Sequence, residues 1–157
     1  MKITLTTIVL LVLMIACKPT SDPLNHWESA KKFRDEQKIT ECITELKLII
    51  DNYPEHPKAP ESQFMIGDIY LNDVKDYEIS IEEFQLVLNN FEESTLSAKA
   101  MFMIGYVYAN NLHAYSDAEE YYNNFLKNYP EHELVLSVEY ELESLKEALA
   151  EIKRLNS

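Results

Sequence analysis

Apolar residues between positions 60 and 91 follow helical spacing, without the alternation that a strand requires. Over about 77–91 they recur every three or four residues, which predicts a helix with one apolar face (Ile81, Phe84, Leu88 and Phe91). Over about 60–72 they fill most of the circumference, which predicts a helix covered on both sides (Phe64, Met65, Ile66, Ile69 and Tyr70). The pattern therefore predicts a pair of helices.

This helix pair is repeated along the chain. The word NYPEH occurs at 52–56 and again at 128–132, 76 residues later, and the related word NFEES begins midway at Asn90. With a shift of 38, ten of the 28 aligned pairs between 64–91 and 102–129 are identical without a gap. A fixed period of this length indicates a stacked-repeat architecture. The first copy is more divergent and keeps its small, aliphatic and aromatic positions at Cys42, Ile50 and Tyr53.

Both glycines of the chain, Gly67 and Gly105, occupy the same place in the middle of a predicted first helix. A glycine inside a helix costs about 1 kcal/mol relative to alanine. Its repetition predicts a close approach by the second helix, at the small residues Ser80 and Ala118. Cys42 stands at that small position in the first copy and is expected to be a buried small apolar residue.

Local signals set the predicted ends of the second helices. The segment Ser116-Asp117-Ala118-Glu119 has the pattern of a capping box and predicts the start of the third copy's second helix. Pro54 and Pro130 end second helices, because proline cannot continue the backbone hydrogen-bond ladder. The Glu-His that closes each NYPEH word is expected to be solvated, with histidines that are structural and bind no ligand.

The pattern changes after the third copy. Residues 134–155 predict one long helix with an apolar stripe at Leu142, Leu145, Leu149, Ile152 and Leu155. Terminal units of a stacked array need a polar outer face, which favours a capping helix here. A helix that recruits a coiled-coil partner is the alternative.

The amino-terminal segment differs in character from the rest of the chain. The apolar run over 3–15 is too short to span a bilayer comfortably and has the length of a signal-peptide core. The tail Met14-Ile15-Ala16-Cys17 resembles a bacterial lipobox, which implies cleavage before Cys17 and lipidation of its thiol. We therefore expect a lipoprotein signal peptide at 1–16 and a lipidated cysteine with its linker at 17–23. A plain secretory signal and a short membrane anchor are the alternatives.

Composition excludes several functions. With 2 Gly and 6 Pro in 157 residues, few positions can form tight hairpins, which argues against an all-β fold. A formal net charge of −13 argues against nucleic-acid binding, which requires clustered Lys and Arg. The four histidines are scattered, and no nucleophile motif, phosphate loop or metal-ligand spacing is present. The sequence therefore predicts no enzymatic activity, cofactor, metal or small-molecule substrate.

The repeated positions resemble the tetratricopeptide repeat (TPR). The match comprises Gly67, Tyr70, Ser80 and Phe84 in one copy, and Gly105, Tyr108, Ala118, Tyr122 and Pro130 in the next. The period here is 38, with a slightly longer turn and a longer link than the family's usual unit. The resemblance implies an all-α superhelical solenoid of antiparallel helix pairs. Its repeats would span about 24–57, 60–94 and 98–132, with a capping helix at about 133–156.

The join at 53–60, YPEHPKAP, resembles that of a bacterial TPR subgroup that includes the outer-membrane lipoprotein BamD and the Tol-Pal-associated protein CpoB. This resemblance implies a membrane-anchored protein-protein interaction scaffold in outer-membrane protein assembly. An envelope adaptor for cell-wall or division complexes is the alternative. The expected location is the bacterial cell envelope, lipid-anchored through Cys17, at the outer membrane and facing the periplasm.

In such arrays the first helices line a concave groove for a protein or peptide partner. By repeat position, the groove candidates here are Phe64, Asp68, Asn72, Phe102, Tyr106 and Asn110. Asparagine side chains can donate and accept hydrogen bonds toward a peptide backbone, and aromatic side chains supply anchoring area. Phe64 and Phe102 can equally be residues of the core.

Overall fold

The computed structural model describes residues 21–155, over which the chain forms α-helices and no strand. Its elements are α1 (Pro23–Asp35), α2 (Ile39–Asn52), α3 (Lys58–Ile69), η1 (Tyr70–Val74), α4 (Tyr77–Asn90), α5 (Leu96–Val107), η2 (Tyr108–Leu112), α6 (Tyr115–Asn128) and α7 (Val135–Leu155). The two η elements are single π-helical turns. The predicted signal peptide and Cys17 lie outside the described residues.

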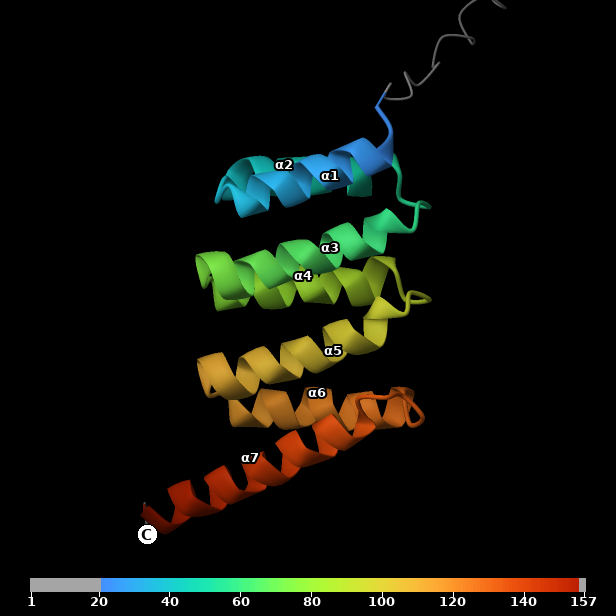
Figure 1. The fold of residues 1–157 in the computed structure, drawn as a ribbon. Helices are drawn as coiled ribbons and strands as arrows, with labels where there is room; N and C mark the ends of the chain where they lie inside the picture. Colours follow the sequence, from blue (N-terminus) through green and yellow to red (C-terminus); the bar gives the residue numbers. More distant parts are fainter. Residues whose placement is uncertain (1–20, 156–157) are drawn as a thin grey trace, which may run out of the picture.

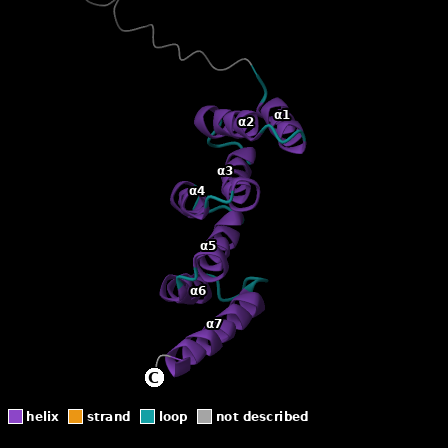
Figure 2. Cartoon of the chain, turned by 90° about the vertical axis from the view of Figure 1, so that its left-hand side faces the viewer, coloured by secondary structure: helices purple, strands orange, loops and turns teal. Residues whose placement is uncertain are grey.

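The helices pair and stack into an elongated two-layer array. Figure 1 shows α1, α3 and α5 stacked along one side, with α2, α4 and α6 behind them and α7 crossing the end of the stack. The turned view in Figure 2 separates the two layers. Consecutive helices make the main contacts throughout, as expected where each repeat touches only its neighbours. The predicted all-α solenoid of helix pairs is confirmed.

The two glycines allow two helices to approach closely, as predicted, but the approaching residue differs from the prediction. A Cβ atom on Gly67 would lie 2.8 Å from the Phe84 ring, and one on Gly105 would lie 2.6 Å from the Tyr122 ring. Ser80 and Ala118 were the expected neighbours. Ser80 instead donates its hydroxyl hydrogen to the Gly67 carbonyl oxygen over 2.8 Å. Each missing side chain therefore makes room for an aromatic ring.

The first helix pair solves the same packing problem with different residues. Ala30, Cys42 and Leu46 are fully buried in one cluster between α1, α2 and α3. Leu46 stands 38 residues before Phe84, so a smaller side chain occupies the aromatic position. An alanine then fits where the later pairs need glycine. The expected burial of Cys42 is confirmed.

The turn within each pair explains an offset between the copies. Gln37, Lys75 and His113 all have positive φ, and they recur at the 38-residue period. In the second pair the Lys75 amide donates to the Tyr70 carbonyl, five residues back as in a π-helix, and the Asp76 amide donates to the same carbonyl from six residues on. In the first pair the Lys38 amide reaches back only five residues, to Phe33. The turn that leads to the positive-φ residue is therefore one residue shorter in the first pair.

The predicted capping box at the start of α6 is wrong. The helix begins at Tyr115, two residues earlier than a cap at Ser116 implies, and its N-cap residue Ala114 makes no side-chain cap. Ser116 already has helical backbone, so it cannot cap from outside. In the second pair the equivalent N-cap is Asp76, whose carboxylate accepts from the Ile79 amide over 3.2 Å.

The NYPEH words end in a helix cap, which corrects the expectation of solvated histidines. The Nδ1 atoms of half-buried His56 and His132 accept from the amides of Lys58 and Leu134, each over 3.1 Å. In the middle copy the Ser94 hydroxyl oxygen accepts from the amide two residues later in the same way. Each of these side chains accepts from an amide at, or one residue before, the first residue of the next helix, where amides have no intrahelical partner.

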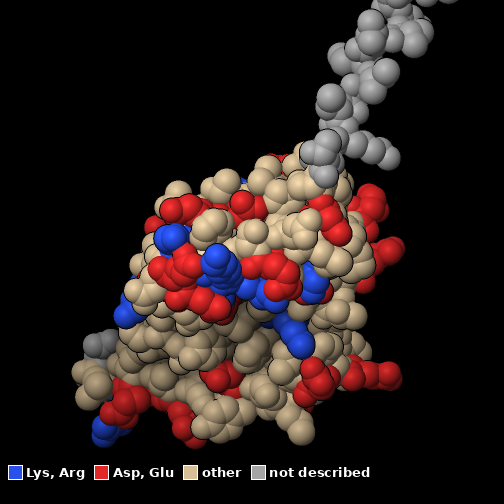
Figure 3. All heavy atoms as spheres, turned by 45° about the horizontal axis from the view of Figure 1, so that its top comes forward, with Lys and Arg blue, Asp and Glu red and all other residues tan. Residues whose placement is uncertain are grey.

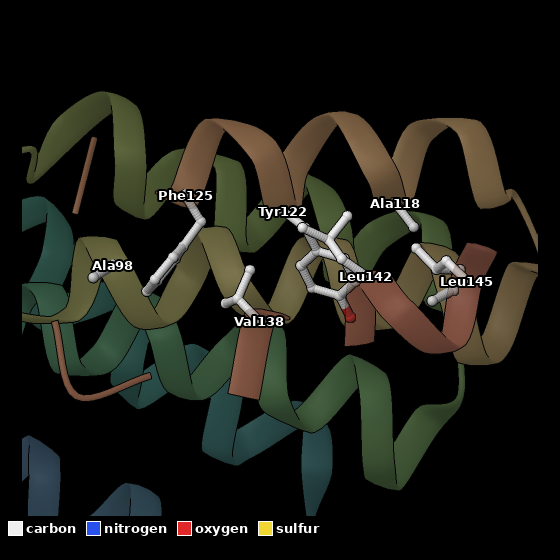
Figure 4. Close-up of a cluster of buried hydrophobic side chains, with 8 residues drawn as sticks. Ala98, Ala118, Tyr122, Phe125, Val138, Leu142 and Leu145 are labelled. Atoms are coloured by element: carbon white, nitrogen blue, oxygen red, sulfur yellow. The ribbon is translucent and has the colours of Figure 1, made fainter. Parts of the chain in front are cut away.

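The last helix covers the end of the stack with only part of its length. Figure 4 shows Val138, Leu142 and Leu145 of α7 against Tyr122 and Phe125 of α6, all buried in one cluster. Farther along α7 the apolar stripe emerges, with Leu149, Ile152 and Leu155 exposed. No helix within residues 21–155 has the length and apolar composition needed to cross a bilayer.

Candidate functional site

A hollow of about 230 Å³ lies between the first helices of the three pairs. Its lining comes from α1, α3 and the start of α5: Trp27, Arg34, Glu61, Phe64, Met65, Asp68 and Leu96. Four of the seven lining residues are apolar, and the other three (Arg34, Glu61 and Asp68) are charged. An apolar hollow with a few placed polar groups is the usual composition of a binding site.

The guanidinium of Arg34, at the edge of this hollow, forms ion pairs with two carboxylates. Its Nη2 donates to Asp68 over 2.7 Å, and its Nε donates to Asp73 over 2.8 Å. Burial lowers the pKa of Arg34, but the hydrogen bonds and charges of the two carboxylates outweigh it and raise the pKa overall. One cation is thus held by two anions, and α1 is linked to α3 and η1.

A second cation stands at the Trp27 end of the hollow. The Nζ atom of Lys58 lies 4.4 Å from the centre of the Trp27 ring and forms an ion pair with Glu61. Such a cation on an indole face contributes about 0.5–1 kcal/mol at exposed sites. Figure 3 shows basic and acidic side chains mixed in one band, beside a hollowed part of the surface formed by uncharged residues.

The predicted groove residues of the second pair gather around the hollow. Phe64 and Asp68 line it, while the Asn72 side chain donates to the Asp68 carboxylate over 2.7 Å. The Phe64 ring also lies 5.0 Å from the Phe84 ring. Phe64 is therefore shared between the core and the hollow, and Asp68 already has two partners.

The predicted residues of the third pair form a separate group farther along the same layer. Phe102 is half-buried, with its ring 6.0 Å from Tyr122 and 6.4 Å from Tyr106. Tyr106 is 37% exposed, and Asn110 donates to its carbonyl oxygen over 3.2 Å. Tyr106 offers the exposed aromatic surface of this group.

Sequence reasoning missed Trp27, Arg34 and Leu96. The one-residue offset in the first pair hides the equivalence of Trp27 and Phe64. Trp27 stands 37 residues before Phe64, whereas the second helices of the pairs repeat with a shift of 38. An alignment of α1 with a one-residue gap would have placed Trp27 at the Phe64 position. The contribution of Leu96 comes from the stacking of α5 on α3, which no local pattern shows.

A larger hollow of about 770 Å³ lies at the loop edge, where the α2–α3 link meets the α4–α5 link. It is formed by loop residues that include Pro54, His56 and Glu92. His56 is already used as a helix cap. Within residues 21–155, no group of three His, Cys, Asp or Glu side chains could hold a metal ion. The hollow between the first helices is therefore the better candidate site.

Comparisons with known proteins agree with this geometry. Residues 99–132 match a family model described as tetratricopeptide repeat. A comparison with curated proteins gives no match. The chain is similar to a solved structure described as the first TPR of Spaghetti (RPAP3) bound to the HSP90 peptide SRMEEVD. That similarity has a TM-score of 0.58 at 20% identity and covers 82% of this chain and 93% of the other.

These findings define the class of the protein. At 20% identity the structural similarity establishes the fold alone. The chain is an all-α, TPR-like solenoid, and the part of it at 99–132 matches a tetratricopeptide repeat.

Proposed function

We propose that this protein is a non-enzymatic protein-protein interaction scaffold that binds a peptide segment of a partner along its first helices. The observation that carries the proposal is the apolar hollow formed jointly by α1, α3 and α5. Aromatic side chains such as Trp27 and Phe64 provide rigid contact area at low entropic cost. The similar solved structure is described as bound to a peptide, which supports peptide binding by this architecture.

We further propose that the scaffold works at a bacterial envelope, anchored by lipid on Cys17 and facing the periplasm from the outer membrane. The lipobox-like tail at 14–17 and the join at 53–60 support this setting. A BamD-like role in outer-membrane protein assembly is the specific form of the proposal. In that role the partner would be another envelope protein, and no nucleic acid or small-molecule substrate would be involved.

Crosslinking in the native host tests this function. A tagged full-length chain would be crosslinked in cells, and the attached proteins identified by mass spectrometry. Recovery of a barrel-assembly protein is the expected result. Recovery of only peptidoglycan-associated or division proteins would overturn the assembly role and favour the envelope adaptor. A Cys17→Ser variant, which cannot take a thioether lipid, is expected to leave the membrane fraction.

A further inference from the structure

The ionisable groups around the hollow have an uneven balance of charge. Arg34 is paired with both Asp68 and Asp73, so this group carries one negative charge in excess. Lys58 is neutralised by Glu61 at the other end. Elsewhere on α1, Lys31 forms an ion pair with Glu28 over 2.8 Å. Among the described residues around the hollow, each of these cations already has an anionic partner.

This balance disfavours an acidic ligand. The peptide named for the similar structure, SRMEEVD, contains three acidic side chains. Such a peptide would need cations that are not already committed, and here it would meet the excess carboxylate at Asp68 and Asp73. The formal net charge of −13 adds a longer-range repulsion.

The size of the hollow limits what can enter it. Small-molecule sites commonly measure roughly 300–1,000 Å³, and this hollow measures about 230 Å³. It therefore suits one large apolar side chain against Trp27, Phe64 and Leu96 better than a whole cofactor. A positive side chain beside that anchor would lie near the Asp68–Asp73 end.

We propose that the groove along the first helices, which contains this hollow, selects peptide segments in which one large apolar residue is flanked by Lys or Arg. The apolar residue fills the hollow between α1, α3 and α5, and the flanking cation adds to the Arg34–Asp68–Asp73 network. This inference rests on the proposed function, because it specifies the chemistry of the peptide that the scaffold binds.

Fluorescence anisotropy with designed peptides tests the charge preference. The full-length chain in detergent would be titrated against labelled nine-residue peptides with a central Trp or Leu and with Lys, Ser or Glu flanks. We expect the Lys-flanked series to bind about tenfold more tightly than the Glu-flanked series at low salt, with the difference shrinking at about 1 M salt because exposed charges are then screened.

A matched pair of variants locates the effect. Asp73→Asn removes one carboxylate of the network at an exposed position and is expected to reduce the preference for Lys flanks. Asp51→Asn removes an exposed carboxylate from α2, in the other layer, and is expected to leave the preference unchanged. Equal loss of preference in both variants would show only a net-charge effect and would overturn the assignment to the groove.

The outcomes separate this inference from the function on which it rests. Tighter binding of the Glu-flanked peptides would overturn the charge preference and leave the peptide scaffold standing. Absence of binding by all three series would contradict both. Circular dichroism of each variant would show that its helices are intact.

Discussion

The first helix pair and the two pairs that follow share one backbone path but fill it differently. In the first pair Ala30 packs with Leu46 in a fully buried cluster. In the second, Gly67 makes room for the Phe84 ring. The combined side-chain volume at the helix crossing is therefore kept: the larger residue on the first helix (Ala30) is matched by the smaller one on the second helix (Leu46). Close-packed interiors tolerate such a volume-conserving exchange far better than a change on one side alone.

The ends of the first helices show the same freedom. The π-helical turns η1 and η2 follow α3 and α5 and place one extra residue before the positive-φ position, whereas α1 has no such turn. The positive-φ residue that follows still recurs at a spacing of 38. A local insertion of this kind shifts the register of the first helix and leaves the second helix in place. The units therefore stack alike, although their sequences do not align without a gap.

The largest expected effect is that of filling one glycine position. Gly105→Ala would place a Cβ atom 2.6 Å from the buried Tyr122 ring. Overpacking of this kind costs about 1–3 kcal/mol, which outweighs the higher helix propensity of alanine. Urea denaturation followed by circular dichroism would measure the loss of unfolding free energy.

A double variant in the second pair checks the exchange directly. Gly67→Ala alone should destabilise, and Gly67→Ala with Phe84→Leu reproduces the Ala30–Leu46 combination of the first pair. We expect the double variant to regain part of the loss. Strictly additive losses would contradict the claim that the two positions exchange volume.

The next effect concerns the cap after the third pair. His132→Ala removes the acceptor for the Leu134 amide and a ring contact with Phe125, and is expected to cost about 1 kcal/mol. His132→Ser should recover much of this, because Ser94 caps the middle join through its hydroxyl oxygen. Thermal unfolding of both variants would decide; equal destabilisation by Ala and Ser would contradict the capping role.

Tyr122→Phe should change stability in the opposite direction. The buried Tyr122 hydroxyl has no hydrogen-bond partner within residues 21–155, and burial raises its pKa. The equivalent residue of the second pair, Phe84, carries no hydroxyl at all. We expect the variant to be as stable as the parent or more stable by up to about 1 kcal/mol. A clear loss in urea denaturation would show that the hydroxyl has a stabilising partner.

The smallest effect depends on pH. Burial raises the pKa of Glu83, and a hydrogen bond from Gln63 opposes it only in part. The folded state thus binds this proton more tightly than the unfolded chain, so the contribution of Glu83 to stability falls as pH rises through the raised folded-state pKa. Glu83→Gln removes this loss and should be more stable at pH 7 by less than about 1 kcal/mol.

Below the ordinary Glu pKa of about 4.3, the Glu83→Gln variant and the parent should converge, because both side chains are then neutral. Glu82→Gln, at an exposed position in the same turn of α4, is the matched control and should change stability by no more than about 0.5 kcal/mol at pH 7. An unchanged difference between Glu83→Gln and the parent across this range would contradict the prediction.

Much of the fold could be predicted from the sequence because helical periodicity and an internal repeat are local signals. Packing partners could not: the small residue Ser80 was expected at Gly67, whereas the Phe84 ring lies there. The cap formed by His56 depends on the geometry of a loop, which composition does not encode.

The candidate site was predicted in part. Phe64 and Asp68 do line the hollow, but the Arg34 ion pairs depend on how α1 stacks on α3. The contribution of Trp27 was hidden by the one-residue difference between the copies. Contacts between units are set by three-dimensional stacking, and a comparison of the copies with one another cannot show them.

The claim that the first helices form the binding face can be tested by photo-crosslinking from two matched positions. A photoreactive amino acid would replace either Tyr106 of α5, which is 37% exposed, or Leu86 of α4, which is 39% exposed. Crosslinks to one partner protein from position 106 and none from position 86 are the predicted result. The same partner captured only from position 86 would contradict the account.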